Sequence, residues 1–216
     1  MADWLNSTFF NLDKSVFVFM NKLAQKADGF FTPFCDFISF LGDGGVCLIL
    51  LCIGLILFRK SRKVGTAMLI AIVIGALFTN VLLKNVIARE RPFDQELLYR
   101  EFWIQAGASV VSEYSFPSGH TTVVMTSMTA LFLCTNKKKS WLVFIFVFFT
   151  GFARVYLIVH YLTDVLAGLL VGGAAGVIAY FISKKMFSYF EKNQDKKLCS
   201  FVLNSDIKNL IKNKQN

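Results

Sequence analysis

Five apolar runs, separated by short polar connections and by one long polar stretch at 84–119, dominate the sequence after residue 36. An α-helix needs roughly 20 mostly apolar residues to cross the hydrocarbon core of a bilayer. The runs approach or reach that length and end at polar or basic stretches. We therefore predict five membrane-spanning helices, at residues 37–58, 64–83, 120–135, 140–159 and 161–182.

The first 42 residues follow a different pattern, because aromatic and aliphatic side chains there alternate with charged ones. Aromatic residues with lysines on another face are typical of a helix that lies in the membrane interface. The segment therefore forms either one broken transmembrane helix or two interfacial helices, and the pattern leaves both open. Residues 42–45, Gly-Asp-Gly-Gly, are predicted to mark the outer end of the first full span.

The composition favours a membrane protein over a soluble one. The chain is 55% hydrophobic and 17% charged, with a mean hydropathy of +0.55, whereas soluble domains are about a quarter charged. We predict an all-α fold, a polytopic membrane bundle of about six helices, with the N-terminal one undecided. Its expected parts are an N-terminal region at 1–42, a transmembrane core at 43–183 and a tail at 184–216.

The basic residues indicate how the bundle is oriented. The net charge of +9 comes largely from the loops 59–63 and 137–139 and the tail, so it gives no reason to expect a nucleic-acid partner. Alternating spans put all three segments on one side, which the positive-inside rule makes cytoplasmic. The stretch 84–119 holds four basic and five acidic residues and falls on the opposite side, together with 154–160. We predict a multi-pass cell-membrane protein whose active site faces the extracellular side.

Ionisable side chains within apolar sequence give the first sign of chemistry. His160 and Asp164 are four residues apart, which makes them neighbours on one helix face. The carboxylate can accept the proton of one imidazole nitrogen and leave the other free to attack. Arg154 and His160 are six apart, about 240° around a continuous helix, so a turn near Val159–His160 is needed to bring both to one ligand. The plainer alternative is a polar group at the lipid headgroups, snorkelling outward.

Two more polar groups are predicted to lie on the same face. Lys84 and Arg91 follow the end of a span, where cations also commonly stop a helix. Ser118, Gly119 and His120 open the next span, where a serine is also an ordinary N-cap. Together the groups have the parts for phosphoryl transfer: cations for the phosphate oxygens, a helix N-terminus for the anion, His160 as nucleophile and His120 as acid.

The spacing of these residues resembles a known family. The patterns Lys84-x6-Arg91-Pro92, Pro117-Ser118-Gly119-His120 and Arg154-x5-His160-x3-Asp164 are similar to the three signature motifs of the type 2 phosphatidic acid phosphatase superfamily. The resemblance covers roughly residues 37–182 and is strongest to the small bacterial members, phosphatidylglycerophosphate phosphatase B and the undecaprenyl pyrophosphate phosphatases. Ala153 stands where the third motif often has serine, which removes one hydroxyl contact to phosphate.

The resemblance implies a lipid phosphatase that works without a metal or other cofactor, through a phosphohistidine on His160. It implies that Asp164 orients His160 and that His120 protonates the leaving oxygen. The implied phosphate-binding residues are Lys84, Arg91, Ser118, Gly119 and Arg154.

The predicted function is hydrolysis of the phosphate monoester of phosphatidylglycerophosphate or phosphatidic acid at the outer membrane face. The alternative substrate is undecaprenyl pyrophosphate, so the expected partners are the bilayer and a phospholipid or polyprenyl phosphate. A membrane transporter is a more distant alternative, because the spans carry few polar groups, chiefly Thr79, Asn80, Thr126 and Ser127. A scaffold with a decayed site is another, but the site residues are intact.

Overall fold

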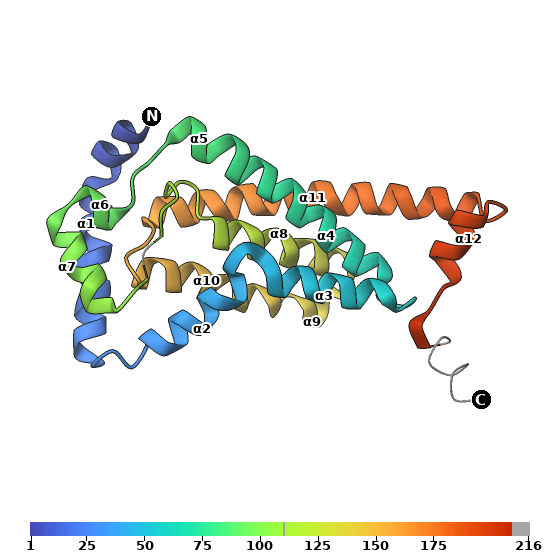
Figure 1. Ribbon diagram of the computed structural model, residues 1–216, viewed down its shortest axis with the longest axis horizontal. Helices are drawn as coiled ribbons and strands as arrows, with labels where there is room; N and C mark the ends of the chain where they lie inside the picture. Colours follow the sequence, from blue (N-terminus) through green and yellow to red (C-terminus); the bar gives the residue numbers. More distant parts are fainter. Residues whose placement is uncertain (110, 209–216) are drawn as a thin grey trace.

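The computed structural model describes residues 1–109 and 111–208, and the regular elements there are all helical. Four helical segments in this part of the chain are long and apolar enough to cross a membrane: Thr32–Leu57, Arg62–Gln95, Lys137–Tyr156 and Leu162–Lys192. The shorter apolar helix α8, Gly119–Cys134, runs alongside them through the bundle (Figure 1). The prediction of an all-α polytopic membrane bundle is confirmed.

Small residues let α8 sit at the centre of the bundle. It packs against α11 (Leu162–Lys192), α4 (Arg62–Ala76) and α10 (Val143–Tyr156). Three glycines of α11 lie so close to the backbone at α8 that a side chain would not fit. A Cβ added to Gly168 would lie 3.0 Å from the Ser118 carbonyl oxygen, and one added to Gly172 or Gly176 would lie 2.8 Å from a carbonyl oxygen of α8. Close backbone approach through small residues is typical of membrane helix packing, and here it sets the position of the N-terminus of α8.

The first apolar segment contains a kink where the sequence predicted an end. Helix α2 (Thr32–Gly42) leads through the short turn η1 (Asp43–Gly45) into α3 (Val46–Leu57). Gly44 and Gly45 have φ values of 52° and 70°, a conformation that glycine adopts without steric cost. The prediction that residues 42–45 mark the outer end of the span is wrong, because these glycines redirect a helical segment that starts at Thr32.

Helix α1 (Ala2–Lys26) runs across one end of the long helices rather than beside them (Figure 1). It packs on α7 (Leu97–Ala106), where Phe17 meets Tyr99 edge-on with ring centroids 4.8 Å apart. The polar stretch 84–119 is thus partly helical, and it also contains α5 (Lys84–Ile87) and α6 (Pro92–Gln95). Just before α5, the helix from α4 passes through a π-helical segment, Leu77–Leu83.

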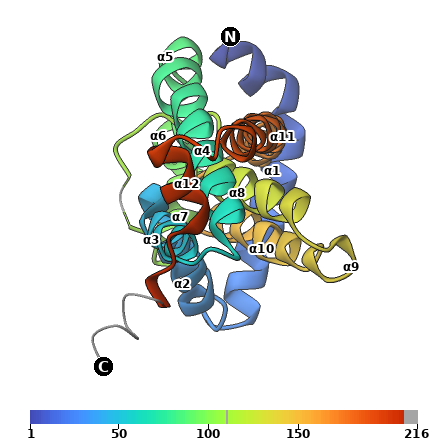
Figure 2. The same cartoon turned by 90° about the vertical axis from the view of Figure 1, so that its right-hand side faces the viewer.

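The three basic segments lie toward the other end of the bundle, with α9 set apart from α12 (Figures 1 and 2). They are the 59–63 loop, α9 (Lys137–Ser140) and the region of α12 (Lys197–Asn204). The Arg62 guanidinium ties two of them, since it donates to carbonyl oxygens of Val202 and Ser205. The separation of the two ends matches the prediction, while residues 209–216 of the tail lie outside the described part of the chain.

Candidate active site

The turn between α10 and α11 brings Arg154, His160 and Asp164 to one place. Arg154 lies in the last turn of α10 and Asp164 in the first turn of α11. The chain reverses at Ile158, whose φ of 55° is uncommon for a β-branched residue. The N–H groups of Val159 and His160 both donate to the Arg154 carbonyl oxygen, at 3.3 Å. The predicted break in the helix is therefore present, and a buried isoleucine makes it without Gly or Pro.

His160 and Asp164 are both buried, at 1% and 0% exposure. Nδ1 of His160 faces Oδ2 of Asp164 across 3.5 Å and makes no hydrogen bond among the described residues. The same Oδ2 accepts from the N–H of Tyr161 at 3.0 Å, closing a capping box at the start of α11. Asp164 therefore faces the imidazole and also caps its helix.

Arg91 occupies the other side of the imidazole. Its Nη1 lies 3.3 Å from Nε2 of His160 and donates to the Val159 carbonyl oxygen at 2.8 Å. Its Nε donates to the carbonyl oxygen of Glu113 at 2.7 Å. The Glu113 carboxylate in turn pairs with the buried Lys84 ammonium. The two cations of the first predicted motif are thus tied together by one residue of the loop that precedes α8.

The N-terminus of α8 lies against these cations. Ser118 caps the helix, since its Oγ accepts from the N–H of Thr121 at 3.5 Å, which confirms the plainer interpretation of this serine. A Cβ placed on Gly119 would lie 3.8 Å from the Lys84 ammonium nitrogen. The first N–H groups of a helix have no partner within it and are suited to an anion.

His120 points toward the kink between α2 and α3. Its Nε2 lies 3.6 Å from a carboxylate oxygen of Asp43, which is 76% exposed. Its ring is also the nearest neighbour of Gly42, where an added Cβ would come within 3.3 Å of Cδ2. The kink therefore forms a wall of the site, which the sequence did not reveal because the Gly-Asp-Gly-Gly stretch looked like a connection between membrane and solvent.

The electrostatics of the site favour an anionic ligand. Burial, and then the charges of Arg91, Arg154 and Lys84, hold the pKa of His160 well below its usual range, so the imidazole is neutral at physiological pH. The hydrogen bond and charge of Lys84 lower the pKa of Glu113. Nε of the buried Arg154 has no hydrogen-bond partner among the described residues. A buried guanidinium with free donors is costly unless a ligand completes it.

Sequence reasoning missed Arg89, a fully buried residue two positions before Arg91. Its Nη1 donates to Asp164 Oδ1 at 2.8 Å and to Thr163 Oγ1 at 2.7 Å. Its Nη2 donates to Asp13 Oδ2 at 3.1 Å. An arginine after the end of a predicted span gives no indication that it is buried. The aspartates that Arg89 binds lie about 75 residues away on either side of it in the chain, so no local pattern could have identified its role.

Asp13 belongs to α1, which makes that helix a neighbour of the site. Burial raises the pKa of Asp13 to about 6 against the opposing effect of Arg89, so the group is mostly ionised at pH 7. The expectation that no metal takes part stays a prediction. In the described part of the chain, no group of three or more His, Cys, Asp or Glu side chains is placed to hold an ion.

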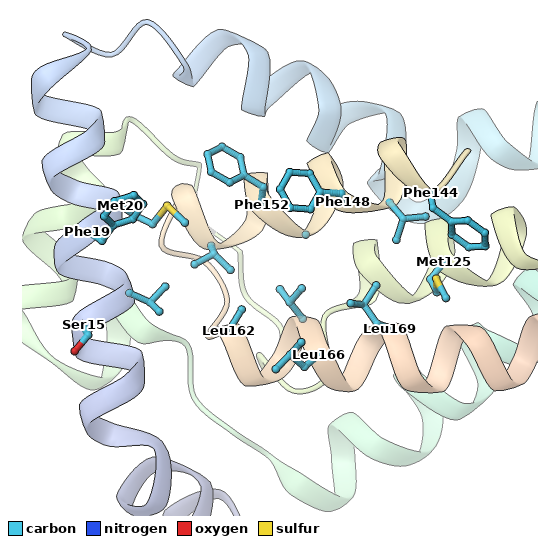
Figure 3. A pocket seen from close by; sticks show the side chains of 15 residues that line it. Ser15, Phe19, Met20, Met125, Phe144, Phe148, Phe152, Leu162, Leu166 and Leu169 are labelled. Atoms are coloured by element: carbon cyan, nitrogen blue, oxygen red, sulfur yellow. The ribbon is translucent and has the colours of Figure 1, made fainter. Parts of the chain in front are cut away.

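A separate apolar groove of about 790 Å³ lies between α1, α8, α10 and α11 (Figure 3). Its walls carry aromatic and aliphatic side chains such as Phe19, Phe148 and Leu166, and Ser15 is the one polar side chain among the described residues that line it. None of the predicted site residues lines this groove. The groove has no group capable of phosphoryl transfer, so the candidate chemistry belongs to the polar site alone.

Comparisons with known proteins place these observations in a family. The model of the PAP2 superfamily matches residues 63–187. An undecaprenyl-diphosphatase of Sulfolobus acidocaldarius is 34% identical over 55% of this chain, which spans about half (54%) of that relative. A lipid A 4'-phosphatase of Bacteroides thetaiotaomicron is 26% identical over 82% of this chain and 79% of its own.

Two solved structures have a similar fold. The crystal structure of Aquifex aeolicus LpxE has a TM-score of 0.59 and 25% identity, covering 78% of this chain and 94% of that one. The PAP2-type phosphatidylglycerolphosphate phosphatase of Bacillus subtilis has a TM-score of 0.57 and 24% identity, covering 84% and 97%.

Proposed function

This chain belongs to the PAP2 superfamily. We propose that it is a membrane phosphatase that acts on the phosphate monoester of a membrane lipid, such as phosphatidylglycerophosphate or phosphatidic acid. The observation that carries the proposal is a neutral, buried His160 with one nitrogen toward Asp164 and the other toward Arg91. That arrangement suits a nucleophile beside a phosphate-binding cation.

In the proposed reaction, Nε2 of His160 attacks phosphorus and the bond to the lipid oxygen breaks. His120 gives that oxygen its proton, and the free lipid alcohol leaves. Water then attacks the phosphohistidine, giving up a proton to His120, and the nitrogen–phosphorus bond breaks to release inorganic phosphate. Asp164 stabilises the imidazolium that forms in the first step.

The cations of the site supply the electrostatic part of the reaction. Lys84, Arg91 and Arg154 hold the non-bridging oxygens, together with the N–H groups at the start of α8. Kinases use Mg²⁺ for the same purpose. In the proposed bound state, phosphate displaces the Glu113 carboxylate from Lys84. Glu113 is largely exposed, at 66%, which makes this exchange cheap.

The surroundings of Lys84 favour a monoester over a diphosphate. A cavity of about 490 Å³ beside it is lined by Asn80, Lys84, Asn85, Ser112, Glu113 and Tyr114. A second phosphate would need another cation there, and Lys84 is the one cationic side chain among the described residues that line the cavity. Amide and hydroxyl groups are better suited to an uncharged, hydroxylated headgroup.

The substrate assignment is tested by phosphate release from purified protein in detergent. Phosphatidylglycerophosphate, phosphatidic acid and undecaprenyl pyrophosphate are compared by kcat/KM under identical conditions. We expect at least one monoester to exceed the diphosphate by more than tenfold. The reverse order would refute the monoester proposal and leave the phosphatase assignment standing.

Polyprenyl diphosphate is the second candidate, supported by the similarity to the Sulfolobus undecaprenyl-diphosphatase, at 34% identity. The lipid A 4'-phosphatase relative supports the monoester instead, and it matches more of the chain. Replacing Glu113 by Lys would add the missing cation beside Lys84. If the monoester proposal holds, this variant should move kcat/KM toward the diphosphate.

We also propose that the active site faces the extracellular side. The support is the position of the basic segments at the opposite end of the bundle (Figure 1). In a background without native cysteines, an impermeant thiol reagent should label Gln105→Cys and not Lys138→Cys in intact cells. Labelling of Lys138→Cys alone would show the opposite orientation and refute the proposal.

A further inference from the structure

Asp13 of α1 and Arg89, which occupies an unspecified position of the first motif, lie directly behind the His160–Asp164 pair. We propose that Asp13 and Arg89 are positioning residues for the nucleophile: Arg89 holds Asp164 in place, and Asp13 neutralises Arg89 so that the charge of Asp164 remains available to His160. The inference rests on the proposed role of His160 and deepens it.

The first step is the geometry of the Arg89 guanidinium. Its nitrogens donate to four acceptors: Asn6 Oδ1 at 2.8 Å, Asp13 Oδ2 at 3.1 Å, Thr163 Oγ1 at 2.7 Å and Asp164 Oδ1 at 2.8 Å. Its Cζ lies 3.5 Å from the centroid of the Tyr161 ring. Arginine presents its donors in a rigid planar fork, so this set fixes the guanidinium in one orientation and Asp164 with it.

The second step is that the two oxygens of Asp164 make different contacts. Oδ1 is held by Arg89, while Oδ2 accepts from the Tyr161 N–H and faces His160 at 3.5 Å. Rotation of the carboxylate would break both contacts at once. Arg89 therefore sets the direction in which Asp164 presents an oxygen to the imidazole.

The third step is the charge. Arg89 contributes +1, while Asp13 and Asp164 contribute −1 each, so this buried cluster carries one surplus negative charge. That surplus matches the positive charge that appears on His160 when its imidazole attacks phosphorus. Without Asp13, the charge of Arg89 would cancel that of Asp164, and the imidazolium would form beside a neutral pair. Buried charges are expensive unless paired, so the surplus charge of this cluster is best accounted for by the positive charge that forms on His160.

The proposal gives α1 a function beyond packing. Asn6 and Asp13 both come from this helix, which crosses the end of the bundle (Figure 1). Phe17, one turn further along, is fully buried against Tyr99 and Tyr161. Aromatic packing thus holds α1, and with it Asp13, against the turn between α10 and α11.

The test is a double-mutant cycle between Asp13→Asn and Asp164→Asn, read as kcat and KM on p-nitrophenyl phosphate and on the lipid monoester. Asp13→Asn alone should lower kcat by roughly 3–30-fold and leave KM nearly unchanged. In the Asp164→Asn background the same change should have almost no effect, because Asp13 acts only through Asp164. Asp13→Glu should restore most of the lost kcat.

Asp3→Asn is the matched control, since Asp3 is an exposed carboxylate on the same helix. It should behave as the unchanged protein in every arm. Equal losses from Asp13→Asn in both backgrounds would overturn the proposal and show a general effect on the fold. So would an unchanged kcat.

If Asp13→Asn fails to fold, Asn6→Ala serves as a second variant. It removes one acceptor of Arg89 and leaves no buried charge unpaired. Under the proposal it should lower kcat by a few fold, again only when Asp164 is present. An unmodified protein inactive on every phosphate ester would refute the proposed function instead. An active protein with additive variants would refute this inference alone.

Discussion

Cations and carboxylates lie on both sides of His160, but cations predominate on one side and carboxylates on the other. On the Nε2 side, Lys84, Arg91 and Arg154 surround the ring, and the one carboxylate bound to them, Glu113, is largely exposed. On the Nδ1 side, a single arginine, Arg89, is held between two buried carboxylates. Arg89 and Arg91 are separated by one residue in sequence, and yet one lies among cations and the other is fully paired.

The difference shows how this fold separates binding from positioning. A cluster with surplus positive charge and an unpaired Arg154 nitrogen is completed by an anion, so it binds. The Arg89 guanidinium already donates to four acceptors, so it has little capacity left for a ligand and instead holds its neighbours in place. The mutations below begin with His160, which the two sides share, and then change the Nε2 side while the Nδ1 side stays intact.

The largest effect is expected for the residue that both sides share. His160→Ala should reduce turnover by roughly 10⁴–10⁶-fold, because no other group can form the covalent intermediate. The measurement is phosphate release, with trapping of ³²P-labelled protein after an acid-free quench. The control is thermal stability in detergent, and a stable variant that still turns over would refute the covalent route.

The acid on the phosphate side should show an effect that depends on the leaving group. His120→Ala should cost roughly 10²–10⁴-fold on a lipid monoester, because an alkoxide needs a proton to leave. On p-nitrophenyl phosphate, which leaves without help, the loss should be much smaller when phosphoenzyme formation limits the rate. A common factor on both substrates would mean that His120 binds phosphate or supports the fold.

A substitution at Arg91 distinguishes the contribution of its charge from that of its geometry. Arg91→Lys keeps the charge but cannot contact His160, Val159 and Glu113 at once. The expected loss in kcat/KM is roughly 10²-fold, the cost of one lost donor to a developing oxyanion. Arg100→Lys, at an exposed position on α7, is the control, and an active Arg91→Lys protein would show that charge alone suffices.

The smallest mutational effect is expected at Glu113. Glu113→Gln should free Lys84 and lower KM by a few fold, since surface ion pairs are weak, roughly 0–1 kcal/mol. The kcat should be unchanged, because the side chain is absent from the bound state. A raised KM would show that Glu113 assists binding.

Chelation should have no effect at all. If the three cations supply the charge that a metal supplies elsewhere, dialysis against EDTA should leave kcat and KM as they were. The measurement is phosphate release before and after dialysis, with added Mg²⁺ as a third arm. Activity lost on chelation and regained with Mg²⁺ would count against the site as described.

The sequence predicted the binding side well because its information is local. Apolar runs of membrane length locate the helix ends, and alternation of the spans puts Lys84, Ser118 and His160 at one end of the bundle. The need for a break between Arg154 and His160 follows from helical geometry alone. The structure confirms each of these positions.

The positioning side could not be predicted in the same way. Arg89 looked like any cation after a span, and Asp13 like one of several charges on an amphipathic helix. The wrong interpretation of residues 42–45 has the same origin, because glycines between polar and apolar sequence are equally consistent with a helix end and a kink.

The sequence by itself determined the helical class, the order of the spans and the candidate residues for phosphoryl transfer, because hydrophobic length and spacing are properties of short segments. Only the tertiary structure decided that α1 crosses the end of the bundle, that Ile158 makes the turn and that Arg89 bridges Asp13 and Asp164. Those outcomes depend on which helices pack together across about 75 residues of chain. Burial then turns an ordinary surface charge into one that must be paired.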